Sequence, residues 1–159
     1  APAAPVSSAA AGNDFAHMKS IIDRKDNGVR AAALRKELGS AMLENAGIFR
    51  DSEKLGLALK AVRDLRDRCQ DTFVQDKGRT FNMDLLFAVE LDNMLLAETM
   101  VVVGIALQES RGSHSRTDFP GRDDEAWLKH TVIYKAPDGP QLEYTPVTIT
   151  RWQPEERAY

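Results

Sequence analysis

The stretch from Phe81 to Ser110 constrains the fold most, because it predicts one long helix with apolar residues on nearly every side. A helix that is apolar all round must be covered all round. Three shorter helices are predicted ahead of it, over 14–25, 29–45 and 51–72, each with an apolar stripe at helical spacing. Three short helices are too few to cover it fully. We therefore expect part of the long helix, or of the bundle beside it, to dock on another domain.

Polar residues mark the predicted ends of these helices. Gly47 is expected to stop the second helix, and Asp51 or Ser52 to cap the third. Gly112 lies where a left-handed cap would follow the long helix. Cys69 belongs to the apolar stripe of the third helix and is expected in the core. The opposite face of that helix is predicted to be solvated and contains Arg63, Asp64, Arg66, Asp67 and Arg68.

The last part of the chain changes from helical to strand patterns. Residues 123–129 predict one more helical turn, and residues 131–135 and 142–149 are rich in the β-branched and aromatic residues typical of strands. The sequence Pro-Asp-Gly-Pro at 137–140 predicts the turn between the strands. Pro146 cannot donate a backbone hydrogen bond, so the second strand is expected at an edge or ending in a bulge.

The predicted fold class is mainly α: a three-to-four-helix, up-down bundle like a spectrin repeat, followed by a small C-terminal β-hairpin. Residues 1–13 are rich in Ala, Pro and Ser and are expected to be a linker or a fragment end. Residues 14–122 are expected to form the bundle, and 123–159 the helical turn, the hairpin and an extended tail. The first residues lack a starting Met and the features of a signal peptide, so we expect a piece of something longer.

Composition excludes several classes of partner. A net charge of −3 provides no basic field for nucleic acid, so no nucleic-acid partner is expected. The most apolar run, residues 99–107, is far shorter than the roughly 20 residues that cross a bilayer, so direct membrane insertion is not expected. The single cysteine gives no disulfide framework and fits a reducing compartment.

The loop from Glu109 to Pro120 is the most charge-dense part of the chain. It contains the Ser, His and Asp of a hydrolase triad, but triads are built from residues distant in sequence, so no hydrolase site is predicted. Its arginines alternate with acidic residues, and such charges pair internally or across an interface. Locking the loop is therefore the default interpretation. Recognition of an anionic substrate by Arg111 or Arg116 is the alternative.

No catalytic, cofactor-binding or metal-binding residue is predicted in this chain. His17, His114 and His130 are widely spaced and lack Cys or carboxylate companions at ligand intervals. No two glycines stand in a G-x-G relation, so the dinucleotide and phosphate-binding fingerprints are absent from the sequence. Trp127 and Trp152 are expected to anchor against another domain, because large aromatic residues dominate docking energetics.

Four stretches carry a resemblance to a known family: Val74–Gly78 with Phe81–Leu85, Glu109–Pro120, Arg122–Asp124 with Trp127–Thr131, and Leu142–Val147 with a chain end at Tyr159. Over roughly residues 29–159 the chain resembles the C-terminal domain of the flavoprotein subunit of succinate dehydrogenase and fumarate reductase. The Glu-Ser-Arg-Gly-x-His core is also similar to that of L-aspartate oxidase. The Arg-Asp-Asp, Trp-Leu-Lys-His-Thr and Tyr-x-Pro-Val motifs favour the first family.

The resemblance implies an oxidoreductase when the protein is whole. In that family FAD-binding and capping domains lie N-terminal to this one, and they hold the FAD and the residues that bind the dicarboxylate. The reaction is hydride transfer between succinate and FAD, with electrons passed to an iron–sulfur subunit and then to quinone. This fragment is expected to be inactive alone and to hold no cofactor. The parent complex is expected in the cytoplasm, peripheral on the inner face of the membrane.

By resemblance, this part is structural: a helical bundle with a small β element packed against the FAD domain. The expected partners are the FAD-binding and capping domains and the iron–sulfur subunit. Two alternatives stay open, the C-terminal domain of L-aspartate oxidase and a non-enzymatic helical adaptor. We expect an ionic clasp that faces the FAD domain, and the candidate clasp residues are Glu109, Arg111, Gly112, His114, Arg116, Asp118, Arg122, Asp123, Trp127 and His130.

Overall fold

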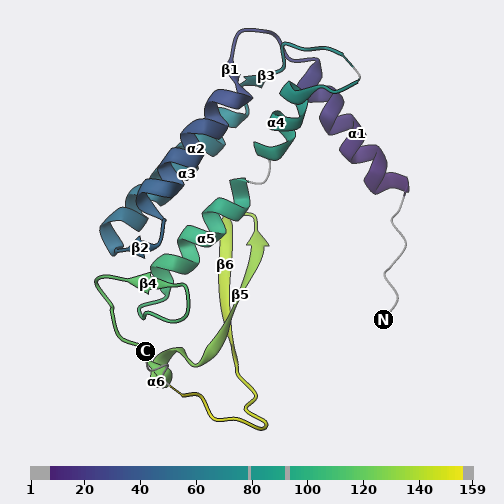
Figure 1. The fold of residues 1–159 in the computed structure, drawn as a ribbon. Helices are drawn as coiled ribbons and strands as arrows, with labels where there is room; N and C mark the ends of the chain where they lie inside the picture. The colour runs from purple at the N-terminus through teal and green to yellow at the C-terminus, as the bar shows by residue number, and fades with distance from the viewer. Residues whose placement is uncertain (1–7, 79, 92–93, 156–159) are drawn as a thin grey trace.

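The computed structural model describes residues 8–78, 80–91 and 94–155 (Figure 1). The chain is mainly α with a C-terminal β-hairpin, as predicted. Its helices are α1 (Ser8–Ile22), α2 (Ala31–Asn45), α3 (Ser52–Cys69), α4 (Met83–Leu91), α5 (Met94–Ala106) and the short α6 (Asp124–Trp127). The hairpin strands are β5 (Lys129–Ala136) and β6 (Gly139–Pro146).

Helices α2 and α3 lie side by side, with α4 packed on α2, α5 packed on α3, and α1 against α4 (Figure 1). Two clusters of buried residues form the core. One joins α1 to α4 and includes Ile21, Leu34, Leu65 and Leu91, with Cys69 partly buried against it as predicted. The other lies between α3 and α5 and is formed by Ala46, Leu55, Ala58 and Val101. Helices α1 to α5 therefore each pack apolar residues against a neighbour.

The single long helix predicted over 81–110 is wrong in extent. The structure places α4 and α5 in that stretch, with residues 92–93 outside the described part. Phe81 has a left-handed backbone, with a φ of 53°, and so precedes the helix. The Asn82 side-chain oxygen accepts from the Leu85 backbone N–H at 2.8 Å and takes up one unpaired donor of the first turn. No described helix is both long and apolar enough to span a membrane.

Short strands at the helix ends also correct the predicted boundaries. Strand β1 (Val29–Arg30) pairs in parallel with β3 (Thr72–Phe73), so α2 begins at Ala31 and α3 ends at Cys69. Strand β2 (Phe49–Arg50) pairs in parallel with β4 (Ser115–Arg116) at the opposite end of the α2–α3 pair. Backbone groups that would have continued the helices are thus used in ladders between segments far apart in the chain.

The first helix begins earlier than predicted. Helix α1 starts at Ser8, inside the stretch 1–13 that was expected to be a linker, and residues 1–7 lie outside the described part. The run of alanines at 9–11 explains the difference, because alanine has the highest helix propensity. The helix ends at Ile22 instead of residue 25.

The C-terminal elements follow the prediction closely. Asp123 caps α6 by accepting from the Ala126 backbone N–H at 3.0 Å. Strand β5 is longer than the predicted 131–135, whereas β6 begins and ends three residues before the predicted 142–149. Gly139 supplies the positive φ of 116° that the turn requires. Pro146 occupies the last paired position of β6, opposite Lys129, where its missing donor is tolerated. Of the expected tail, residues 156–159 lie outside the described part of the chain.

Candidate functional site

Arg116 lies at the centre of the predicted clasp and is buried, with only 1% of its surface exposed. Its guanidinium reaches the C-terminal end of α5, where Nη1 donates to the carbonyls of Gly104 at 2.7 Å and Leu107 at 3.2 Å. The last carbonyls of a helix have no partner within the helix, and a cation there also complements the helix dipole. Arg116 therefore closes the end of α5.

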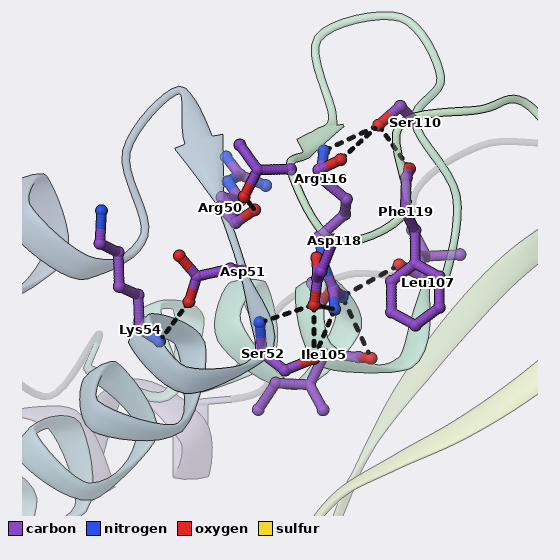
Figure 2. A network of polar contacts seen from close by, with 12 residues as sticks. Arg50, Asp51, Ser52, Lys54, Ile105, Leu107, Ser110, Arg116, Asp118 and Phe119 are labelled. Atoms are coloured by element: carbon purple, nitrogen blue, oxygen red, sulfur yellow. Dashed lines mark hydrogen bonds and ion pairs between the residues drawn. The ribbon is translucent and has the colours of Figure 1, made fainter.

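Asp118 joins this arginine to the start of α3 (Figure 2). Its carboxylate accepts from Arg116 Nε and Nη2, both at 2.7 Å, in the bidentate geometry that guanidinium and carboxylate favour. It also accepts from the Ser52 backbone N–H at 2.9 Å and from the Ser52 hydroxyl at 2.7 Å. The Arg116 guanidinium holds the pKa of Asp118 far below its usual range. The ion pair thus links the negative end of α5 to the positive end of α3.

Backbone bonds hold the rest of the loop against β2. Thr117 N–H donates to the Arg50 carbonyl at 2.8 Å, next to the β2–β4 pairing. The Ser110 hydroxyl donates to the Phe119 carbonyl at 2.8 Å and accepts from the Arg116 N–H at 2.8 Å. These contacts fasten the charged loop to the rest of the domain (Figure 2).

A second ionic network continues toward α6. Glu109, 3% exposed, receives a bidentate pair from Arg111, with Nε at 2.7 Å and Nη2 at 3.0 Å. Its carboxylate also accepts from the Asp123 backbone N–H at 3.0 Å. Arg111 and Arg122 both bind Asp124, and these two guanidinium groups lower the pKa of the Asp124 carboxyl to about 2. The start of α6 is thereby fixed to the end of the loop.

A tight turn around Gly112 orients His114. Arg111 and His114 exchange backbone hydrogen bonds at 2.9 and 3.0 Å, and Gly112 has the positive φ of 60° that glycine tolerates best. His114 Nδ1 lies 3.1 Å from Arg50 Nη1 and Nε2 lies 3.3 Å from the Leu107 carbonyl. Arginine only donates, so Nδ1 accepts and Nε2 carries the proton. Burial, with Arg50 and Arg116 nearby, lowers the pKa of His114 and favours this neutral ring.

The structure brings most of the candidate clasp residues together and leaves two apart. Hydrogen bonds and the Gly112 turn connect the eight residues Glu109, Arg111, Gly112, His114, Arg116, Asp118, Arg122 and Asp123. Trp127 instead packs edge-on against Tyr144 at 5.9 Å, and His130 is exposed on β5. Arg111 and Arg116 bind carboxylates of this same region, which is the internal pairing of the default interpretation.

Sequence reasoning missed three residues. Arg50 and Ser52 complete the clasp from more than sixty positions away, with no local signal in the sequence. Glu98 is the third, a carboxylate on α5 with 1% of its side chain exposed. It binds Arg63 Nε at 2.9 Å and Arg66 Nη1 at 2.6 Å, so the face of α3 predicted to be solvated is instead paired with α5 at these two positions. A lone acid within an apolar helix was the signal available.

Carboxylates of the chain itself bind backbone N–H groups at the start of α3, the helix start nearest the clasp. A pyrophosphate needs backbone N–H groups at a helix start or a glycine-rich loop. At the start of α3 those groups are taken by carboxylates, with Asp118 on the Ser52 N–H and Asp51 on the Lys54 N–H. Within the described residues, no group of three or more His, Cys, Asp and Glu side chains could hold a metal ion.

Comparison with known proteins decides the family. The sequence model described as "Fumarate reductase flavoprotein C-term" matches residues 35–159. The chain belongs to this family. It is 43% identical over 134 residues to the fumarate reductase flavoprotein subunit of Mycobacterium tuberculosis, which covers 83% of the chain. It is 38% identical over 130 residues to the succinate dehydrogenase flavoprotein subunit of Coxiella burnetii, which covers 80% of the chain.

A solved structure agrees with this membership. Quinol fumarate reductase of Escherichia coli superposes with a TM-score of 0.86 at 34% identity, over 98% of this chain and 28% of that one. The match covers only 23% of the M. tuberculosis relative and 21% of the C. burnetii relative. The chain thus spans about a quarter of the length of these flavoprotein subunits, and it is similar to the C-terminal domain of the flavoprotein.

Proposed function

We propose that this chain is the docking domain of an FAD-dependent oxidoreductase that interconverts succinate and fumarate. In this proposal the preceding FAD-binding and capping domains hold the flavin and carry the reaction, and this domain contains no catalytic group. The observation that carries the proposal is that the arginines of the clasp are already paired within the domain. Arg111 and Arg116, the residues best suited to bind a dicarboxylate, are both engaged by carboxylates of the chain itself.

The clasp would serve assembly by fixing one surface of the domain. It ties the end of α5, the start of α3 and the start of α6 into a single rigid unit. Rigid surfaces lose little conformational entropy when they dock. The partly exposed Arg111 and the exposed Asp124 lie on the outer side of the clasp, and we propose that they face the FAD-binding domain.

The partners and the location extend the same proposal. Electrons from the flavin would pass to an iron–sulfur subunit and then to quinone, with the complex in the cytoplasm on the inner face of the membrane. The support is the similarity to the quinol fumarate reductase of E. coli and to the fumarate reductase flavoprotein subunit of M. tuberculosis.

The test uses the intact flavoprotein subunit that contains these residues. We expect Arg111→Ala to lower the bound flavin, because the surface that holds the FAD domain is loosened, while the KM for fumarate stays unchanged in the flavin-loaded fraction. Arg35→Ala is the matched control, because Arg35 forms an exposed ion pair with Glu90 outside the clasp. Full flavin content with a large rise in KM would move Arg111 to the substrate site and contradict the proposal.

A second measurement tests the division of labour. The 159-residue chain is incubated with FAD, passed through gel filtration and examined for visible flavin absorbance. We expect no retained flavin, since the helix start nearest the clasp is closed by carboxylates. Retained flavin would place a cofactor site in this domain.

A further inference from the structure

Helix α5 has two apolar faces, and only one of them is covered by the described chain. On the covered face Val101 is fully buried, and a Cβ added to Gly104 would lie 3.3 Å from Leu55 of α3. The other face shows Leu96, Met100, Val103 and Leu107 at the i, i+4, i+7 and i+11 positions of one stripe. Leu96 is 63% exposed and Met100 is 57% exposed.

Met100, Val103 and Leu107 of this stripe form one wall of a groove. The hairpin lies beside α5 (Figure 1), and Ile133 of β5 contributes to the opposite wall. The groove has a volume of about 330 Å³, and its walls are Thr99, Met100, Val103, Gly104, Leu107 and Ile133. Its lining is predominantly apolar, which is typical of a site that receives another apolar surface.

Arg50 lies at the groove next to His114. Its Nε donates to the Gly47 carbonyl at 2.7 Å and its Nη1 to His114 at 3.1 Å. Within the part of the chain that the structure describes, Arg50 forms no ion pair, whereas Arg111 and Arg116 each bind a carboxylate. A partly buried guanidinium without an acid favours a partner that brings a carboxylate.

We propose that this groove receives an apolar segment of the domains that precede this one in the flavoprotein subunit, and that a carboxylate of the segment pairs with Arg50. The inference rests on the proposed function. Two observations select this occupant. The matched region is only 23% of the M. tuberculosis relative, so most of that subunit lies outside it and is available to cover the groove. The apolar walls and the neighbouring Arg50 guanidinium favour a segment that is apolar and contains a carboxylate.

The test places a photo-crosslinking amino acid at Met100 in the intact flavoprotein subunit and identifies the linked peptide by mass spectrometry. We expect a crosslink within the same subunit, to a preceding segment in which Asp or Glu adjoins apolar residues. The matched control is the same amino acid at Leu57, which is 53% exposed on α3 outside the groove. A crosslink to a second copy, a crosslink to a separate protein, an equal yield at Leu57 or no crosslink would each overturn the proposal.

Charge variants test the role of Arg50. With the crosslinker at Met100, Arg50→Gln should lower the yield about tenfold, the loss expected when one partner of a docking ion pair is removed, and Arg50→Lys should restore part of it. Equal yields for Gln and Lys would overturn the assigned role of Arg50. Circular dichroism of both variants in the 159-residue chain shows whether the domain is still folded.

Met100→Gln provides a variant that makes the groove polar without placing a charge beside Arg50. Because Met100 is exposed, the 159-residue chain should keep its thermal midpoint, whereas the intact subunit should have a lower one. An unchanged midpoint in the intact subunit would overturn the proposal. Flavin content is measured on the same samples. A subunit that binds flavin but gives no crosslink from Met100 would contradict the groove proposal alone. A subunit that binds no flavin would contradict the proposed function.

Discussion

The clasp and the groove both lie near the C-terminal half of α5, and they use opposite chemistry. The clasp comes from the most charged part of the sequence, yet its central arginine is buried and its carboxylates are paired with arginines of the same domain. The groove belongs to the most apolar helix, yet Met100 is open to solvent. In this chain the charged loop therefore forms internal ion pairs, and the apolar helix provides the surface left for a partner.

Desolvation explains the difference. A guanidinium removed from water must have nearly all its donors paired, so Arg116 has little capacity left for a partner. An exposed apolar side chain has no unpaired polar group to satisfy. Covering it later by a partner contributes roughly 25 cal/mol of favourable free energy per Å² of apolar surface. The four predictions that follow test this comparison, from the largest expected effect to the smallest.

Arg116→Met should give the largest loss of stability. It removes the guanidinium from the Asp118 carboxylate and from the last carbonyls of α5, which costs about 3 kcal/mol of the free energy of unfolding, the lower end for a broken buried pair, because Asp118 keeps its Ser52 donors. Urea denaturation of the 159-residue chain measures it. Arg116→Lys keeps the charge and loses the bidentate geometry, so its stability should lie between that of the unsubstituted chain and that of Arg116→Met. Met100→Ser is the groove control and should change stability by about 0.5 kcal/mol or less. Equal losses at both positions would break the comparison.

Glu98→Gln should cost less than the arginine substitution. The Glu98 carboxylate is buried, but Arg63 and Arg66 are about half exposed and can be rehydrated when the charge is removed. We expect a loss of about 1–2 kcal/mol in the same urea experiment. A loss as large as that of Arg116→Met would mean that burial of a charge, and not the closing of two helix ends, determines how much stability each substitution costs.

Gly112→Ala should destabilise the clasp through its backbone alone. At the positive φ of Gly112 an L-residue is strained, and the expected cost is about 1 kcal/mol. Gly121→Ala is the matched control, because Gly121 has no positive φ and no neighbour in the space of an added Cβ. Thermal melting of the two variants should separate them. Equal midpoints would show that the turn does not hold the loop.

His114→Asn should give the smallest effect, a change in the pH dependence of stability. The pKa of His114 is lowered by burial, so just below pH about 6.5 the unfolded chain binds a proton that the folded chain does not. Stability from this residue is present above that pH and is lost as the pH falls through the folded pKa. The slope of unfolding free energy against pH, measured above pH about 5 to exclude carboxyl titration, should be flatter in the variant. Identical slopes would show that His114 does not contribute to the pH dependence of stability.

Local patterns predicted the elements, and long-range contacts decided their ends. The apolar spacing of α2 and α3 predicted those helices well, and Asp51, one of the two predicted cap residues, is the cap. The pairings of β1 with β3 and of β2 with β4 are only two residues long, so they leave no pattern in the sequence. The β1–β3 pairing nevertheless sets where α2 begins and where α3 ends.

The composition of the clasp was readable, but its partners were not. Arg116 and Asp118 stood in a loop whose mixed charges predicted internal pairing. Ser52 and Arg50 could be added only by the fold, because nothing near them in the sequence marks them as partners. Glu98 could have been found, since a single carboxylate among apolar helical residues requires a cation from a neighbouring element.

The β2–β4 pairing has a consequence for the order of folding. Strands β1 and β3 close the α2–α3 pair within residues 29–73, whereas β2 must wait for residues 115–116 before it has a partner. Contacts between distant residues carry a larger loop-closure cost and tend to form late. We therefore expect the clasp at the end of α5 to form after the rate-limiting step of folding. Weakening it should mainly speed unfolding and leave the folding rate nearly unchanged, so the clasp governs how long the domain stays folded.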